Sequence, residues 1–249
     1  MALFHCNFGS STLGLACSAD VILPDNRKEP SRPLATLWLL HGLSDDHTIW
    51  QRRTSIERYA AAYRLAVVMP AVDRSFYADM QYGLKYWTYL SEELPGQMRQ
   101  YFPLSAQRQD NFAAGLSMGG YGAFKLALNL PERYVAAASL SGALDLTGIW
   151  ASAERKAILQ LISDKSPKGT SNDLLHVAAK LASSRKPQPR LFQWCGTEDF
   201  LYADNLRFRD HARKLGLKVD YSEGPGGHSW DRWDEQIVKV LEWLGVETA

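Results

Sequence analysis

Short apolar runs alternate with helical patterns along most of this 249-residue chain, and this alternation restricts the fold more than any other feature. Such runs are typical of strands that are buried on both faces of a sheet. They cover residues 34–40, 65–69, 111–116, 135–140, 190–195 and 218–222. Helical patterns separate or follow them at residues 51–63, 86–101, 119–130, 205–215 and 233–244. The alternation predicts βαβ units, and therefore an α/β protein with a mostly parallel central sheet and helices on both faces.

The beginning of the chain departs from this pattern. Apolar runs around residues 13–19 and 21–23 predict antiparallel strands that lead into the sheet. Residues 25–33 are polar and contain two prolines, so we expect a surface loop there. Further along, Pro95-Gly96 should interrupt the helix expected over residues 86–101.

A second departure lies between two of the expected strands. Residues 145–189 are far more than a short loop and one helix need, and helical patterns cover residues 158–162 and 174–181. We expect this segment to form a small cap over the sheet edge rather than an elaborated crossover. A segment of this size is too small to fold alone, so we expect residues 1–249 to form a single domain.

Charge and cysteine content exclude several classes of protein. The formal net charge is +1, from 28 Lys and Arg against 27 Asp and Glu, which argues against a general nucleic-acid binder. Three cysteines, Cys6, Cys17 and Cys195, form no C-x-x-C pair and favour a reducing compartment over a disulfide framework. The N-terminal residues lack the pattern of a signal peptide, and no apolar run is long enough for a membrane span. We therefore expect a soluble cytoplasmic protein.

The motif that carries chemistry is G-L-S-M-G at residues 115–119, which fits the pattern G-x-S-x-G. An expected strand precedes it and an expected helix follows it, with a further glycine, Gly120, just inside that helix. This is the strand–turn–helix context in which a nucleophilic serine projects above a sheet. The context favours Ser117 as a nucleophile over a chance turn of small residues.

A serine hydroxyl needs a base to accept its proton, and the base in turn needs an acid. In this fold the chain order is serine, acid, histidine. Among six histidines only His228 follows the last expected strand, in the glycine-rich loop at residues 224–230. The acid should follow the strand that ends at residue 195, where Glu198 and Asp199 are adjacent. We favour Asp199 for its shorter side chain, and Glu198 remains the alternative.

The negatively charged oxygen of a tetrahedral intermediate needs hydrogen-bond donors. One donor should be the backbone N–H of Met118, directly after the nucleophile, and the other should come from the loop after the strand at residues 34–40. We assign the second donor to the N–H of Leu43, and we interpret His41 as a hydrogen-bonded packing residue at the strand end.

Other polar and aromatic clusters carry weaker signals. Residues 44–47, Ser-Asp-Asp-His, lack the spacing of metal ligands, so we interpret them as a polar loop and expect no metal. No phosphate-binding glycine motif accompanies a strand, so we expect no nucleotide and no other cofactor. Trp50, Phe76 and Trp87 are candidates for the lining of an acyl pocket.

Five segments together resemble one family. They are L-L-H-G-L-S (39–44), Y-W-T-Y-L-S-E-E-L-P (86–95), G-L-S-M-G-G-Y-G-A (115–123), N-L-P-E-R-Y (129–134) and C-G-T-E-D-F (195–200). They are similar to the esterase D-like group of α/β hydrolases, over residues 3–244. This group contains bacterial tributyrin (acetyl) esterases, S-formylglutathione hydrolases, some cinnamoyl esterases and, more distantly, the antigen 85 mycolyltransferases.

The resemblance implies an α/β-hydrolase fold and a serine carboxylesterase that hydrolyses short-chain acyl esters, without a cofactor. It places the family's triad on Ser117, Asp199 and His228 and its oxyanion donors on Leu43 and Met118. S-formylglutathione hydrolases usually carry a threonine–cysteine pair soon after the oxyanion glycine, whereas this chain has L-S-D-D at residues 43–46. The small-ester branch is therefore favoured, with S-formylglutathione hydrolysis as the first alternative.

The resemblance leaves two weaker enzymatic alternatives, a cinnamoyl esterase and an acyltransferase. A non-catalytic binding module on a hydrolase scaffold is disfavoured, because such proteins usually lose a triad residue and all three positions are filled here. The expected partner is a small ester, with no nucleic acid and no membrane. A homo-oligomer is compatible with the sequence.

Overall fold

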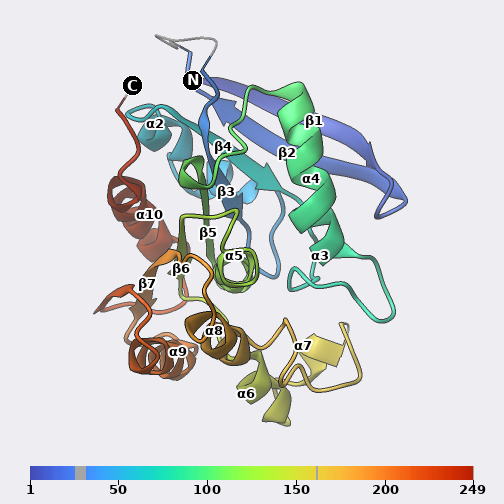
Figure 1. Ribbon diagram of the computed structural model, residues 1–249, viewed down its shortest axis with the longest axis vertical. Coiled ribbons are helices and arrows are strands. Elements are labelled where there is room, and N and C mark those ends of the chain that lie inside the picture. Colours follow the sequence, from blue (N-terminus) through green and yellow to red (C-terminus); the bar gives the residue numbers. More distant parts are fainter. Residues whose placement is uncertain (26–31, 161, 249) are drawn as a thin grey trace.

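A single sheet organises the protein, in a computed structural model that describes residues 1–25, 32–160 and 162–248. In this part of the chain the sheet has eight strands, in the order β1-β2-β4-β3-β5-β6-β7-β8 (Figure 1). Their bounds are Ala2–Ser10 (β1), Leu15–Leu23 (β2), Ala35–Leu40 (β3), Leu65–Pro70 (β4), Asn111–Leu116 (β5), Ala136–Leu140 (β6), Arg190–Gly196 (β7) and Val219–Gly224 (β8). The six strands β3 to β8 are parallel to one another, whereas β2 pairs antiparallel with both β1 and β4. The predicted mostly parallel sheet is confirmed.

Helices cover both faces of this sheet (Figure 1). On one face lie α1 (Ile49–Arg53), α2 (Ile56–Ala60) and α10 (Trp230–Leu244). On the other face lie α3 (Tyr86–Thr88), the π-helix η1 (Tyr89–Glu93), α4 (Leu94–Tyr101), α5 (Met118–Asn129), α8 (Leu174–Ala182) and α9 (Tyr202–Lys214). A short 3₁₀ helix, η2 (Arg108–Asp110), precedes β5.

Two hydrophobic cores follow from this layering. Side chains of successive strand residues point to opposite faces, so Trp38 and Leu40 of β3 enter the core under α5, while Leu37 and Leu39 enter the core under α10. Every residue of β4 and β5 is buried, as the continuous apolar runs predict. Because these strands are parallel, their carboxyl ends lie at the same edge of the sheet.

The N-terminal hairpin is antiparallel, as predicted, but its bounds differ from those expected. The first strand is β1, which pairs with β2 along its whole length from Ala2–Leu23 to Ser10–Leu15. The two runs expected at residues 13–19 and 21–23 form the single strand β2, preceded by the hairpin turn. β1 was missed because it is an edge strand whose side chains are mostly exposed and form no apolar run. Of the surface loop predicted at residues 25–33, residues 26–31 lie outside the described part of the chain.

Two helical predictions were wrong in detail. The helix expected over residues 51–63 is split into α1 and α2 at Thr54, whose hydroxyl oxygen accepts a hydrogen bond from the Ile56 amide at 3.1 Å. The helix is not broken at Pro95-Gly96, because helical backbone continues from η1 into α4 and Arg133 Nη1 donates at 2.6 Å to the Ser91 carbonyl that lacks a donor from Pro95. The irregular turn is instead η1, directly before it.

The segment between β6 and β7 contains three helices, α6 (Leu146–Ala151), α7 (Ala157–Gln160) and α8. α8 packs against both α5 and α9, which is the position of a crossover helix, while α6 and α7 lie beyond it (Figure 1). The helical patterns at residues 158–162 and 174–181 correspond to α7 and α8, and residue 161 lies outside the described residues. α6 was not expected. The interpretation as a cap on a single domain stays a prediction.

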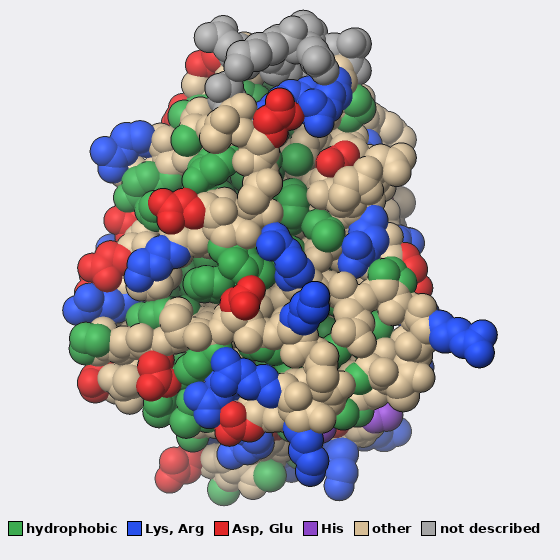
Figure 2. All heavy atoms as spheres, turned by 60° about the vertical axis from the view of Figure 1, so that its left-hand side comes forward, with side chains coloured by type: hydrophobic (Ala, Val, Ile, Leu, Met, Phe, Trp, Pro, Cys, Tyr) green, Lys and Arg blue, Asp and Glu red, His purple; other side chains and the backbone are tan. Residues whose placement is uncertain are grey.

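Charged side chains of both signs are interspersed over the face of the molecule in Figure 2, with no large region of one sign. This distribution agrees with the near-zero net charge. Among the helices of the described residues, none combines the length and the apolar character that a bilayer span requires.

Candidate active site

Ser117 occupies the sharp turn between β5 and α5. Its backbone angles, φ 52° and ψ −118°, lie in a region that residues other than glycine rarely adopt. Such a conformation costs about 1–3 kcal/mol and persists only where the surroundings hold it. Here the Ser117 amide donates to the Leu140 carbonyl at 2.9 Å, and the Ser117 carbonyl accepts from the Ala143 amide at 3.1 Å. The end of β6 therefore holds the strained turn.

The glycines of the motif allow α5 to pack directly on the end of β3. A Cβ atom on Gly119 would lie 2.3 Å from the carbonyl oxygen of Leu40, and one on Gly115 would lie 2.5 Å from the Gly119 carbonyl carbon. Neither distance is possible for real atoms. The amide of Met118 consequently lies at the helix N-terminus, where N–H groups have no partner within the helix.

Asp199 and His228 meet at the same edge of the sheet, although 29 positions separate them in the chain. Asp199 follows β7, His228 lies in the loop between β8 and α10, and their Oδ2 and Nδ1 atoms are 2.8 Å apart. Asp199 is only 5% exposed and also accepts a hydrogen bond from the Leu201 amide at 2.8 Å. The structure thus brings together the acid and the histidine that the chain order suggested.

The surroundings keep Asp199 ionised. Burial raises its pKa, but hydrogen bonds with His228, the Leu201 amide and Ser141 outweigh this effect, so the pKa is lowered overall.

Ser141 was not identified from the sequence. It is fully buried, has φ 48°, and accepts a hydrogen bond from Trp233 Nε1 at 3.2 Å. The Trp233 ring also packs edge-on against the His228 imidazole at 4.8 Å.

Glu198, the alternative acid, has a different role in this geometry. Its carboxylate is exposed, accepts a hydrogen bond from the Gly226 amide, and accepts another from the Thr197 hydroxyl at 2.8 Å. It therefore contacts the backbone of the loop that carries His228 rather than the imidazole itself.

The loop after β3 is held by His41. His41 Nε2 accepts from the Val72 amide at 3.0 Å, so Nδ1 carries the proton and donates to the Gly42 carbonyl at 2.7 Å. Burial lowers the pKa of His41, which favours this neutral form. In a trans peptide the C=O and N–H point in opposite directions, so the Leu43 N–H is directed away from the imidazole. Within the described residues, nothing accepts a hydrogen bond from the Leu43 amide.

Comparisons with known proteins show the family of this chain. Residues 10–244 match the model of a family described as "Putative esterase". The chain is 30% identical over 261 residues to an acetyl esterase of Caldicellulosiruptor saccharolyticus, with 98% of each chain covered. The chain belongs to this esterase family. Its activity class is therefore that of a carboxylic ester hydrolase.

Two solved structures from Staphylococcus aureus are similar to this esterase over 98% of both chains and are 39% identical to it. The serine hydrolase FphF, with substrate bound, superposes with a TM-score of 0.89. The S-formylglutathione hydrolase FrmB superposes with a TM-score of 0.86. These likenesses confirm the α/β-hydrolase fold.

The three aromatic residues suggested for the acyl pocket lie in different places in the esterase. Trp50 is buried under α10 and donates through Nε1 to the Leu40 carbonyl at 3.1 Å. Phe76 is buried on the opposite face of the sheet, and the half-buried Trp87 packs against the ammonium of Lys125. The structure does not bring these three side chains together, and their role in substrate binding stays a prediction.

An apolar pocket of about 210 Å³ opens between α6, α7 and the loop that precedes α8. Its apolar lining consists of Ala78, Leu146, Trp150, Leu159 and Ile162, and the rest of its lining comes from residues of the segment 163–172. α6 follows β6, so the pocket lies on the same side of the sheet as the carboxyl ends of the strands. Ligands bind on this side in open α/β sheets.

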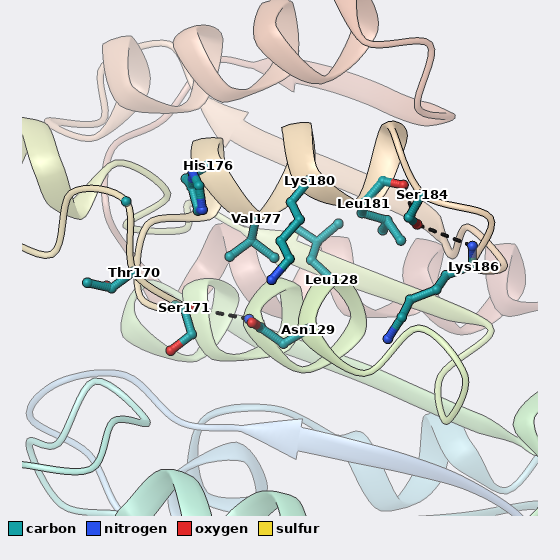
Figure 3. Close-up of a pocket in the computed structure, with 11 residues that line it drawn as sticks. Leu128, Asn129, Thr170, Ser171, His176, Val177, Lys180, Leu181, Ser184 and Lys186 are labelled. Carbon is teal, nitrogen blue, oxygen red and sulfur yellow. Dashed lines mark hydrogen bonds between the residues drawn. The ribbon is translucent and has the colours of Figure 1, made fainter.

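A second pocket, of about 220 Å³, lies between the end of α5 and α8 (Figure 3). Leu128, Val177 and Leu181 form its apolar part, while the side chains of Lys180 and Lys186 extend beside it. Asn129 closes one end through a hydrogen bond to the Ser171 carbonyl at 3.2 Å. None of the residues proposed for chemistry lines this pocket.

The two carboxylates of the polar loop at residues 44–47 have local hydrogen-bond partners, whereas the buried His47 Nδ1 has none within the described residues. Asp45 accepts from the Gly42 amide at 3.2 Å, and Asp46 accepts from the Thr48 amide at 2.9 Å. Across the described residues, no group of three or more His, Cys, Asp or Glu side chains is arranged to hold a metal ion.

Proposed function

We propose that this esterase hydrolyses short-chain acyl esters through a Ser117–His228–Asp199 triad. The observation that carries the proposal is the 2.8 Å hydrogen bond between Asp199 and His228, formed at the sheet edge where the strained Ser117 turn lies. The relative named as an acetyl esterase supports the choice of a small acyl group.

In the first half of the reaction, His228 Nε2 accepts the Ser117 proton while the serine oxygen attacks the ester carbonyl. His228 becomes positively charged, and the ionised Asp199 beside its Nδ1–H stabilises that charge and fixes the tautomer. The charged histidine then gives its proton to the departing alcohol, and an acyl-serine remains.

In the second half, water attacks the acyl-serine while His228 accepts its proton; the bond between the acyl carbon and the Ser117 oxygen then breaks, the carboxylic acid departs, and His228 returns the proton to Ser117. Both halves pass through a tetrahedral intermediate whose oxygen carries a negative charge. We assign the stabilisation of that oxygen to the amides of Met118 and Leu43. Loss of one such donor typically lowers the rate by 10²–10³.

Steady-state hydrolysis of p-nitrophenyl acetate and butyrate tests the proposal. Wild type should turn over both esters, and Ser117→Ala should lose activity to the background while unfolding at the same temperature. Equal and negligible turnover by wild type and Ser117→Ala would refute the esterase mechanism.

A second candidate is S-formylglutathione hydrolysis, because the FrmB structure, named as such an enzyme, is 39% identical to this chain. The L-S-D-D sequence at residues 43–46 disfavours it. A comparison of kcat/KM for S-formylglutathione and for acetyl, butyryl and feruloyl esters separates the candidates. A preference for the thioester by several orders of magnitude would replace the short-chain ester assignment.

A further inference from the structure

Tyr77 links the loop after β3 to the helix that begins at the nucleophile. It lies in the loop after β4 and is fully buried. Its hydroxyl donates to the His41 carbonyl at 2.8 Å. This carbonyl belongs to the peptide directly before the Gly42–Leu43 peptide, whose N–H we assign to the oxyanion. Tyr77 therefore anchors the loop from outside, in addition to the anchoring by the His41 imidazole within it.

The Tyr77 ring fits into a notch in α5. A Cβ atom on Gly122 would lie 2.5–2.8 Å from three carbon atoms of that ring, so only glycine accommodates the ring at this position. One turn earlier, Gly119 packs on the backbone of Leu40 and His41. The ring of Tyr77 and the glycine at position 119 thus set the distance between α5 and the loop after β3 at two separate points.

The backbone of Tyr77 is strained and needs support. Phe76 and Tyr77 have φ values of 49° and 51°, which are unusual for aromatic residues. Lys125 of α5 supplies the support, because its Nζ donates to the Tyr77 carbonyl at 2.6 Å. Lys125 is only 1% exposed, and its ammonium lies 4.5 Å from the centre of the Trp87 ring.

A lysine at this buried position lowers the stability of the folded protein, because its amine loses its contact with water. Burial lowers the pKa of Lys125 to about 7, although the charge of Asp79 opposes this shift. A methionine would fill a similar volume without the cost of desolvating an amine. The amine donates to the Tyr77 carbonyl whether it is charged or neutral, so this contact persists on both sides of neutral pH.

We propose that Tyr77, held by Lys125, is a positioning residue that fixes the spacing between the two oxyanion donors, the amides of Met118 and Leu43. The proposal rests on the proposed esterase mechanism, because only that mechanism assigns the two amides a role. Tyr77 touches neither substrate nor the reacting atoms, and it acts through the His41 carbonyl and α5.

The variant Tyr77→Phe tests this by removing one hydroxyl. Tyr121→Phe is a matched control, because the Tyr121 hydroxyl is also buried and donates to a backbone carbonyl, that of Asn172, at 3.0 Å. With p-nitrophenyl butyrate, Tyr77→Phe should lower kcat by about 10-fold, less than the loss of a whole donor. KM should stay within about twofold, because the loop acts on the transition state. Tyr121→Phe should leave kcat close to wild type at a similar unfolding temperature.

Lys125→Met tests the second half of the proposal. It should reproduce the loss of kcat, and Tyr77→Phe/Lys125→Met should lose little more than the stronger single variant, since both act on one loop. Independent losses that multiply in the double variant would overturn the role of Lys125 as the support of Tyr77.

Hydrogen–deuterium exchange supplies a readout that does not depend on activity. Exchange in a peptide covering residues 41–48 should accelerate in Tyr77→Phe and not in Tyr121→Phe. Unchanged kcat together with unchanged exchange in Tyr77→Phe would overturn the proposal. If wild type hydrolyses no ester but exchange still accelerates only in Tyr77→Phe, the anchoring of the loop is supported and the esterase mechanism fails.

Discussion

Glu93 offers the clearest test of how the N-terminal hairpin is attached to the rest of the protein. Its half-buried carboxylate accepts four hydrogen bonds from the turn between β1 and β2. The donors are the Ser10 hydroxyl at 2.5 Å, the Ser11 amide at 2.7 Å, the Ser11 hydroxyl at 2.8 Å and the Thr12 amide at 3.2 Å. Glu93→Gln keeps the shape of the side chain but removes the charge and replaces one acceptor oxygen with a donor.

The size of the effect follows from the pKa of Glu93. Burial raises this pKa, but the hydrogen bonds from Ser10, Ser11 and Thr12 outweigh burial and lower it from 4.5 to about 2. This difference corresponds to at most about 3.4 kcal/mol of folding free energy. Water screens a partly exposed group, so we expect about 1–2 kcal/mol. For a chain of this length, the unfolding temperature of Glu93→Gln should fall by about 2–8 °C at pH 7.

The pH dependence gives this prediction its sign. A lowered carboxyl pKa adds stability that is fully present above pH 4.5 and is lost as the pH falls towards 2. Urea unfolding of wild type and Glu93→Gln at pH 7, 5, 4 and 3 should therefore show a difference in the free energy of unfolding. This difference should be the same at pH 7 and pH 5 and should become smaller below pH 5. A difference of the same size at pH 7 and pH 3 would contradict a role for the Glu93 charge, because it would have to come from packing.

Three further predictions concern the active site. Asp199→Asn should lower kcat by about 10⁴ in the ester assay with little change in unfolding temperature, whereas Glu198→Gln should lower it far less; the reverse order would exchange the two acids. Gly119→Ala should lower the unfolding temperature by about 5 °C or more in a thermal melt, since its Cβ would overlap a strand carbonyl, while Gly96→Ala, with open space around it, should not. Trp150→Ala should raise kcat/KM for hexanoyl over butyryl esters by about 10-fold if the apolar pocket takes the acyl chain, and an unchanged ratio would exclude that pocket.

The parallel strands could be predicted because their signal is local. A strand buried on both faces is nearly all apolar, so residues 65–69 and 111–116 stand out without any knowledge of their neighbours. β1 has no such signal, because its stability comes from pairing with β2 at the edge of the sheet. Pro95 misled because the sequence does not show that Arg133, distant in the chain, supplies the donor that the Ser91 carbonyl would otherwise take from residue 95.

The placement of the active site could be predicted to the extent that it depends on chain order. Parallel strands end at one edge, so residues that follow successive strands meet there, and Asp199 and His228 do meet. The supporting residues could not be found in this way. Ser141 and Tyr77 support the site through buried hydroxyls, and Lys125 through a buried amine, and serine, tyrosine and lysine carry no signal in a sequence until their partners are known.

Backbone strain is concentrated at one edge of the sheet, the edge at which we propose the active site. In the described part of the chain, the residues other than glycine with positive φ are Asp73, Phe76, Tyr77, Ser117 and Ser141. All of them follow β4, β5 or β6, at the carboxyl ends of three parallel strands of the sheet. Strain persists only where other contacts hold it, and here the holders include Lys125 for Tyr77 and the Leu140 carbonyl for Ser117. Weakening one of these contacts should therefore relax the loops before it unfolds the sheet. A substitution that is too mild to lower the unfolding temperature should already lower the esterase activity.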